Sequence, residues 1–325
     1  MDRDDRGHRD RLRRGLVVLT FNVWFENSRR GVDKNQSKEH GFGSWPERCA
    51  ALQKWLHVLQ PDVICLQEVL QGGGHDMLAD LFGPQDASAT DSTEYPYRFY
   101  ARASQWWIDD KVNFGNAIVS RFPLARTRAL QLPVQLTPGV KFYETRGAAL
   151  AEISSPFGAV FVASLHLNHQ LHQPAIRLLQ TRAVTSSMQD FVNEGVNKNV
   201  LTQLLCGDFN AKPDEACIRF LRGSHPVTEP GAEDVFFQDA WSFCNGEEGG
   251  FTWSRKNPGA NVDLEEDKRL DYIFASLPHR DGRGLVEDCR VVCDHPFAGD
   301  FPSDHFGVLT EIRAHPSLDT PRAKY

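Results

Sequence analysis

The chain has 325 residues, with 36 Lys and Arg residues against 43 Asp and Glu residues, for a formal net charge of −7. This length can bury a large core, and the acidic balance disfavours a protein that coats nucleic acid without sequence preference. Its cysteines form no CxxC pair, and no segment reaches the ~18 apolar residues that a membrane helix needs. We therefore expect an intracellular globular protein, cytoplasmic or nuclear, without a membrane segment.

The N-terminus, MDRDDRGHRDRLRR, is densely charged and lacks the apolar stretch of a signal peptide. Such charge runs are typical of solvated tails, although these arginines could also contact an acidic partner. We find no internal repeat or linker that divides the remaining chain. The sequence thus predicts a disordered tail over residues 1–14, one domain over residues 15–315 and a C-terminal tail over residues 316–325.

The first third of the chain alternates strand and helix patterns. Apolar, β-branched residues predict a strand over residues 16–23, and a polar loop covers residues 29–43. Apolar residues at helical spacing follow Pro46, and Pro61 ends that helix. A second buried strand is predicted over residues 62–66. The segment 80–95 is rich in Asp, Ser, Thr and Pro and predicts an exposed loop.

The rest of the chain is dominated by strand patterns. Hairpin-like strands are predicted over residues 97–107, 113–124 and 149–167, followed by a helix over residues 174–192. A strand over residues 200–206, a short helix over 213–221 and strands over 269–276 and 305–312 complete the pattern. These elements predict a single α/β domain.

Polar side chains lie where several predicted strands end or begin, namely Asn22, Glu68, His166, Asp208, Asn210, Asp304 and His305. A buried acid without a partner costs several kcal/mol, so these carboxylates should meet water, a donor or a shared cation. Carboxylate and amide oxygens without Cys/His zinc spacing suit Mg²⁺, with Mn²⁺ as the alternative. A metal, a base and a cationic histidine together suit hydrolysis of a phosphate ester.

Each residue taken alone has a structural explanation. Asn22 could cap a turn, Asp208 could begin the helix near residue 213, and His166 could be a core histidine with satisfied hydrogen bonds. The joint pattern favours the functional interpretation, because several metal-compatible side chains follow strands in the same way.

The sequence resembles the endonuclease/exonuclease/phosphatase (DNase I-like) superfamily of Mg²⁺-dependent phosphoesterases. The matching stretches are LTFNVW (19–24), DVICLQEV (62–69), NFGNAIVSRFP (113–123), SLHL (164–167), CGDFN (206–210), RLDYIF (269–274) and PSDHFGVL (302–309), in the family's order. The resemblance implies a four-layer α/β sandwich, in which two packed, mainly antiparallel β-sheets are flanked by helices and the active site lies at one edge.

The resemblance also implies roles on the metal side of the site. Glu68 matches the principal metal ligand. Asn22 lies beside it and would contact the metal or the phosphate, so it is a candidate both for catalysis and for metal binding. Asp304 matches an additional carboxylate for the metal or its water network.

The remaining catalytic roles concern the attack on phosphorus. Asp208 matches the aspartate that orients or deprotonates the attacking water, and Asn210 matches the amide that positions the phosphate. His305 resembles the histidine that binds the scissile phosphate, and Asp271 the carboxylate that orients this histidine and favours its protonated form. His166 would be a second histidine on the phosphate side.

Within the superfamily, the C-terminal third resembles tyrosyl-DNA phosphodiesterase 2-like proteins. Trp253 would stack on a nucleotide or phosphotyrosyl ring, or it could be a buried core tryptophan. Arg146 and Lys212 are candidate phosphate contacts, with an ordinary surface salt bridge as the alternative. Lys212 stands where the family has an arginine, which keeps the charge but loses bidentate geometry. His169 follows His166 without an evident partner.

These matches predict a phosphodiesterase that hydrolyses a phosphodiester by in-line attack of water, on DNA or on a protein-linked nucleic-acid end, in DNA repair. We expect a monomer. Two alternatives stay open at this stage. One is hydrolysis of a lipid or small phosphoester, as in neutral sphingomyelinases, and the other is a binding module that retains the fold without turnover.

Overall fold

The structure, a computed structural model, describes residues 15–25, 43–85, 94–106, 109–134, 145–195, 197, 199–224, 235–260, 265–297 and 299–316. The predicted N-terminal tail lies outside these residues, as do nearly all of the predicted C-terminal tail and of the loop at 29–43.

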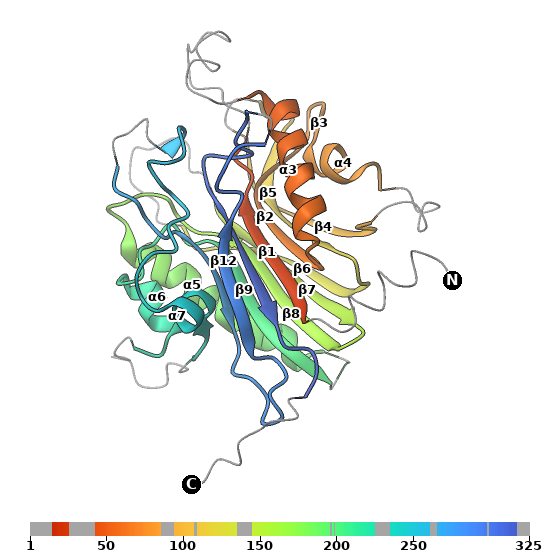
Figure 1. The fold of residues 1–325 in the computed structure, drawn as a ribbon, viewed down its shortest axis with the longest axis vertical. Coiled ribbons are helices and arrows are strands. Elements are labelled where there is room, and N and C mark those ends of the chain that lie inside the picture. The colour runs from red at the N-terminus through yellow and green to blue at the C-terminus, as the bar shows by residue number, and fades with distance from the viewer. Residues whose placement is uncertain are drawn as a thin grey trace.

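Two β-sheets pack face to face (Figure 1). The first contains β1 (Leu16–Asn22), β2 (Val63–Gly72), β3 (His75–Asp76), β4 (Tyr97–Gln105), β5 (Asn113–Ser120), β12 (Val286–Val292) and β13 (Gly307–Ile312). The second contains β6 (Leu124–Gln131), β7 (Gly147–Ser155), β8 (Gly158–His166), β9 (Val200–Asp208), β10 (Gln238–Asp239) and β11 (Asp271–Ala275).

The strand orders are β12-β13-β1-β2-β5-β4, with β3 on β2, and β10-β11-β9-β8-β7-β6. Among the strand pairs of the described chain, β1–β2 and β8–β9 are parallel and the others are antiparallel. The mainly antiparallel sandwich that the sequence predicts is therefore confirmed.

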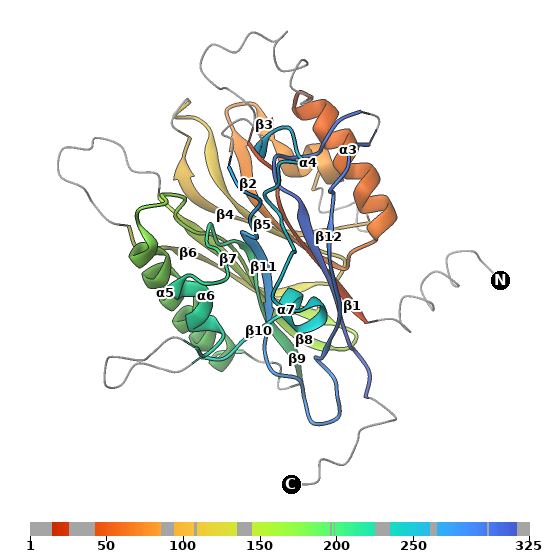
Figure 2. The same ribbon diagram turned by 60° about the vertical axis from the view of Figure 1, so that its left-hand side comes forward.

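Helices cover the outer faces of the sandwich (Figure 2). The helices α3 (Trp45–Leu59) and α4 (Met77–Phe82) pack on the first sheet, and α5 (Pro174–Asn193) and α6 (Ala216–Leu221) on the second. A short helix, α7 (Ala240–Asn245), contacts β11 and β12. The four-layer architecture is thus confirmed. No helix of the described residues is long and apolar enough to span a membrane.

The interface between the sheets is a mostly apolar core. Its buried side chains come from both sheets and include Val18 and Cys65 from the first sheet and Val162, Leu204 and Ile273 from the second. Full burial of one such aliphatic side chain contributes roughly 1.5–3 kcal/mol. The core therefore provides a rigid support for the polar side chains at the edge of the sandwich.

Two parts of the predicted element pattern are wrong. The segment 80–95 is not all an exposed loop, because α4 extends to Phe82 and Tyr95 is buried. The helix forms because Asp76 accepts a hydrogen bond from the main-chain N of Ala79 at its first turn. The strand predicted over residues 113–124 is two strands, since β5 ends at Ser120 and β6 begins at Leu124.

Candidate active site

Three strands of the second sheet bring His166, Asp208 and Asp271 into one row. His166 lies opposite Asp208 in the register of β8 and β9, and Asp208 lies opposite Asp271 in the register of β9 and β11. Side chains at opposed positions of adjacent strands project from the same face of a sheet, ~5 Å apart. All three side chains are buried.

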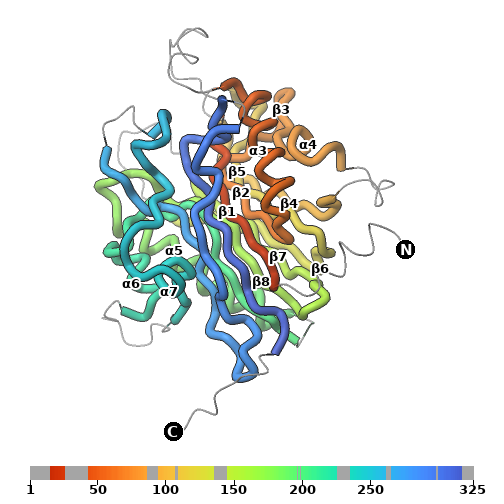
Figure 3. The backbone as a smooth tube through the Cα atoms, viewed as in Figure 1, coloured from red at the N-terminus to blue at the C-terminus, as the bar shows by residue number. Residues whose placement is uncertain are grey.

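The first sheet supplies the facing set of side chains. Asn22 ends β1, and Glu68 lies in a β-bulge of the neighbouring strand β2. Asp304 and His305 come just before β13, which pairs with the other side of β1 (Figure 3). Because β1 lies between β2 and β13, residues far apart in the chain meet at this edge.

Unusual backbone conformations support the placement of these groups. Gly207 has a φ of 149°, and a Cβ atom there would lie 1.9 Å from the carbonyl oxygen of Leu165, so the approach of β8 to β9 requires glycine. Asn210 has a φ of 48°, a conformation that asparagine tolerates better than most residues. Glu68 has a φ of 62° in its bulge, which turns its carboxylate towards the site.

Asn22 links the two sheets by hydrogen bonds. Its Nδ2 donates to Glu68 Oε1 at 3.2 Å and to Asp208 Oδ2 at 3.1 Å. Its Oδ1 accepts a hydrogen bond from the main-chain N of Trp24 at 3.0 Å. The side chain is therefore a neutral bridge between the buried carboxylate of Asp208 and the partly buried carboxylate of Glu68, and a direct bond from Asn22 to a metal remains a prediction.

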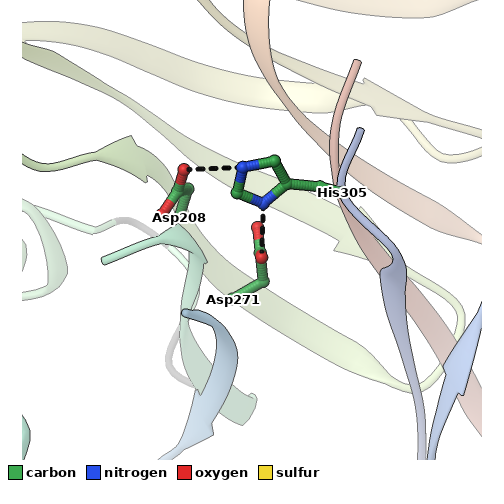
Figure 4. A group of neighbouring side chains, drawn as sticks. All are labelled: Asp208, Asp271 and His305. Atoms are coloured by element: carbon green, nitrogen blue, oxygen red, sulfur yellow. Dashed lines mark hydrogen bonds and ion pairs between the residues drawn. The ribbon is translucent and has the colours of Figure 1, made fainter. Parts of the chain in front are cut away.

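His305 lies between two carboxylates of the opposite sheet (Figure 4). Its Nδ1 is 2.8 Å from Asp271 Oδ2 and its Nε2 is 3.8 Å from Asp208 Oδ2. Burial alone lowers the pKa of His305, but the charges of Asp271 and Asp208 outweigh burial and raise this pKa well above its ordinary value. The imidazole is therefore held in its cationic form.

Asp271→Asn is expected to move the alkaline limb of the pH–rate profile to lower pH and to reduce kcat about tenfold or more. The raised pKa of His305 means that its contribution to stability is complete below the ordinary value of 6.5 and is lost as pH rises through the raised value. Without the Asp271 carboxylate, this loss begins at lower pH.

NMR titration of the His305 ring protons in wild type and variant measures this change without reference to turnover. A His305 pKa that is the same in both proteins would contradict the role given to Asp271.

Glu68 and Asp304 fit a hard cation. Burial, and then the charge of Asp304, raise the pKa of Glu68 to about 7, and burial also raises the pKa of Asp304. A divalent ion between two such carboxylates would offset both the cost of burying their charges and the repulsion between them. Among the described residues, Asp208, Asp271 and His305 also offer ligand atoms within 4.8 Å of one another. These three side chains are therefore a second group in the site that could hold a metal ion.

Arg146 and His166 are buried side by side, and His166 lies next to the carboxylates of Asp208 and Glu68. Nη1 of Arg146 is 3.1 Å from His166 Nδ1, and His166 Nε2 is 3.4 Å from Asp208 Oδ2. Burial, and then the charge of Arg146, keep the pKa of His166 well below its ordinary value, so this ring is neutral. Arg146 is buried rather than on the surface. A surface salt bridge therefore does not describe it, and its contact with phosphate remains a prediction.

The two other predicted substrate residues differ in their positions. The ring centroid of Trp253 lies 5.0 Å from that of His305, with 65° between the planes, so this indole is next to the imidazole of His305. It is only partly buried. Lys212 is exposed and forms a surface salt bridge with Glu266, which was the alternative to a phosphate contact.

Sequence reasoning missed several residues that contact this site. His169 is not without a partner, because its Nδ1 is 2.7 Å from Nη2 of Arg146. Thr252 Oγ1 accepts hydrogen bonds from the main-chain N of Leu270 and of Asp271, each at 3.1 Å. Arg48 donates to the main-chain oxygen of Pro302 at 3.0 Å, near Asp304. Of Thr252 and Arg48, only Thr252 could have been suspected from the sequence, because it directly precedes the candidate substrate residue Trp253.

A family model described as the endonuclease/exonuclease/phosphatase family matches residues 19–305. The chain therefore belongs to the endonuclease/exonuclease/phosphatase family, as the motifs predict. The match contains each of the catalytic and metal-binding candidates discussed above.

Two curated relatives and one solved structure are similar to this chain. Nocturnin of Xenopus laevis is 24% identical over 306 residues, which cover 92% of this chain and 72% of that protein. CCR4-NOT transcription complex subunit 6-like-B of Xenopus laevis is 24% identical over 193 residues, which cover 50% of this chain but only 35% of that protein. The chain thus spans about a third of the length of this second relative.

The solved structure is D. rerio TDP2 complexed with a single-strand DNA product. Its TM-score is 0.61 and its sequence identity is 17%, and the match covers 92% of this chain and 98% of that chain. At this identity the likeness shows the fold alone.

Proposed function

We propose that this protein is a Mg²⁺-dependent phosphodiesterase that attacks a phosphodiester in line with an activated water molecule. The observation that carries the proposal is the Asn22 bridge between Glu68 and Asp208, with His305 held against Asp271 beside it. In the proposed mechanism these groups supply a cation site, a base and a cationic hydrogen-bond donor.

Each side chain has a chemical task in the proposed reaction. Asp208 accepts the proton of the attacking water, and the main-chain N of Asn210 orients its carboxylate by donating to Oδ1 at 2.8 Å. Cationic His305 donates to a phosphoryl oxygen and stabilises the charge that develops there. Arg146, with His166 beside it, offers positive charge to a second oxygen of the phosphate.

Glu68 and Asp304 would hold the Mg²⁺ ion, with Asn22 next to them. When bound, the ion supplies Lewis-acid stabilisation of negative charge on the phosphate oxygens. Mn²⁺ would satisfy the same oxygen ligands.

For the substrate we propose a nucleic-acid end, with a 5′-phosphotyrosyl DNA end as the first choice. Trp253 supports this choice, because an indole beside His305 offers a stacking surface to a ring joined to the scissile phosphate. The motifs of the C-terminal third favour the same substrate, and the fold, which is similar to that of TDP2, is compatible with it. A role in DNA repair inside the cell follows from this proposal.

A second candidate is a nuclease that shortens polyadenylated RNA. The observation that favours it is the similarity of sequence to Nocturnin and to a CCR4-NOT subunit, since the superfamily also includes deadenylases. The candidate site serves either substrate, because the chemistry at phosphorus is the same.

A panel of substrates tests the proposal. Purified protein with Mg²⁺ is expected to release tyrosine from a 5′-phosphotyrosyl single-stranded DNA and to leave a 5′-phosphate, with activity lost in EDTA. Abasic duplex DNA, plain oligonucleotides, polyadenylated RNA and sphingomyelin are measured in parallel. Turnover of RNA alone would favour the second candidate, and no turnover of any phosphoester would reject the phosphodiesterase proposal.

A further inference from the structure

A polar network crosses the apolar interface between the sheets, beneath the candidate active site. Gln67 of β2 donates from Nε2 to Ser164 Oγ of β8 at 3.0 Å. Ser164 Oγ donates in turn to the main-chain oxygen of Leu66 at 3.1 Å, and Thr20 Oγ1 lies 3.3 Å from Gln67 Nε2. The side chains of Thr20, Gln67 and Ser164 are 0% exposed.

The surroundings make this network unusual. Most buried side chains between the sheets are aliphatic, aromatic or thiol groups, such as Val18, Cys65 and Val162. Asn116 of β5 is another buried polar side chain there, and its Nδ2 donates to the main-chain oxygen of Gly147 of β7 at 2.6 Å. An amide in such a core gains nothing from transfer out of water and must recover its lost hydrogen bonds. An apolar side chain of similar volume would pack there at no such cost. Stability alone therefore does not explain a buried glutamine at position 67. A satisfied polar network does explain it if the network fixes the positions of the two strands that it joins.

The network lies directly next to the residues of the site. Gln67 immediately precedes Glu68, and its main-chain oxygen accepts from the main-chain N of Val23, the residue after Asn22. Ser164 lies two residues before His166, so both side chains project from the same face of β8. One hydrogen bond thus connects the strand that carries Glu68 to the strand that carries His166.

The site is divided between the two sheets, so their relative position decides its geometry. Asn22 reaches Asp208 at 3.1 Å, His305 reaches Asp271 at 2.8 Å and His166 lies 4.0 Å from Glu68, and each of these contacts crosses from one sheet to the other. A displacement of ~1 Å at a catalytic site can reduce rates about 100-fold.

We propose that Gln67 and Ser164 are positioning residues that set the separation of the two halves of the active site. The inference rests on the proposed phosphodiesterase function and assigns neither residue a contact with substrate or metal. It explains why a fully satisfied polar pair is buried in a mostly apolar layer directly behind Glu68 and His166.

Gln67→Met, Ser164→Ala and the double variant test this role. Gln67→Met keeps the volume but leaves the Thr20 hydroxyl without its hydrogen-bond partner, so we expect a lower urea midpoint that an added Thr20→Val restores, and a kcat lowered roughly 10- to 100-fold with or without Thr20→Val. Ser164→Ala leaves the Gln67 amide without its partner and lowers the midpoint. Adding Gln67→Met to Ser164→Ala should restore the midpoint towards wild type while kcat stays low.

The matched control is Ile118→Val, which removes one methyl group from the same inter-sheet core. It is expected to lower the urea midpoint and to leave kcat within twofold of wild type. A Gln67→Met variant with wild-type kcat would overturn the proposal. So would a kcat that returns to the wild-type value when Thr20→Val restores the midpoint of Gln67→Met, since this would indicate a merely structural role.

Titration of Mn²⁺ into the metal-free proteins separates this proposal from the proposed function. A wild type that binds Mn²⁺ but hydrolyses no phosphoester would end the proposed function alone. In that case we still expect crystal structures of Gln67→Met and wild type to differ by ~1 Å in the separations of Asn22 from Asp208 and of His305 from Asp271, because both contacts cross from one sheet to the other. Equal separations would overturn the positioning role whatever the activity.

Discussion

Asp208→Asn is expected to lower kcat about a thousandfold, because a positioned general base contributes roughly 10²–10⁴ to the rate. Asparagine keeps the shape of the side chain and an oxygen for the main-chain N–H of Asn210, but it cannot accept a proton from water. Rates measured at pH 7.5 with saturating Mg²⁺ on the best substrate of the panel give the size of this effect.

The loss should not come from unfolding. Burial, and then the charge of Asp271, raise the pKa of Asp208 to about 6, above its ordinary value of 3.8. For a carboxyl with a raised pKa, stability is complete below the ordinary value and is lost as pH rises through the raised one. The wild type has therefore lost this contribution at pH 8, while neutral asparagine has not. Asparagine has no second oxygen to accept from Asn22 Nδ2, and this lost hydrogen bond offsets about 1 kcal/mol of the gain, so we expect a stability close to that of wild type there.

Asp239→Asn is the matched control for this experiment. Asp239 is also a buried aspartate of the second sheet, but it pairs with Arg269 at 3.2 Å and caps α7 through the main-chain N of Trp241. Its replacement should lower the free energy of unfolding by about 1–3 kcal/mol and leave kcat within a few-fold of wild type. More than a tenth of wild-type kcat in Asp208→Asn would refute the assignment of the base.

The sequence was sufficient for the part of the site that lies at strand ends. An apolar run followed by an acid or amide marks the point where a buried strand reaches the edge of a sheet, as at Glu68 and Asp208. The structure brings these residues together with Asn22, His166 and His305, because β1, β2, β8, β9 and β13 end or begin at the same edge. Short motifs in the family's order predicted the same set.

What the sequence could not predict depends on contacts between distant segments. Nothing near Gln67 indicates that its amide meets Ser164 in the opposite sheet, and nothing near His169 indicates that it meets Arg146. Local composition also misled, because α4 lies beside a segment rich in turn residues. In each case the partner is brought in by packing rather than by neighbours in the chain.

Glu68→Gln is expected to remove both the activity and the response to metal, and to make the metal-free protein more stable at alkaline pH. The pKa of Glu68 is raised from 4.5 to about 7 by burial and then by Asp304, so its contribution to stability is complete below pH 4.5 and lost as pH rises through about 7. This pKa shift corresponds to about 3 kcal/mol of stability that the wild type loses at alkaline pH and the variant does not. A hydrogen bond that the variant lacks offsets about 1 kcal/mol of this gain.

Urea unfolding in EDTA at pH 4.5 and pH 8 measures this effect. The variant should be close to wild type at pH 4.5 and about 1–2 kcal/mol more stable at pH 8. Adding Mg²⁺ at pH 8 should then stabilise the wild type alone, since binding to the folded state raises stability in proportion to RT ln(1 + [L]/Kd). The variant keeps no carboxylate at position 68 for the ion.

Glu152→Gln gives the opposite result for a buried glutamate away from the site. Glu152 of β7 is buried and pairs with Arg126 at 2.6 Å, so its neutralisation leaves the guanidinium without that charge and should lower stability while the Mg²⁺ response persists. If Glu68→Gln were still stabilised by Mg²⁺ as much as wild type, the ion would have to bind elsewhere, and the repulsion between the charges of Glu68 and Asp304 would then lower stability without serving metal binding.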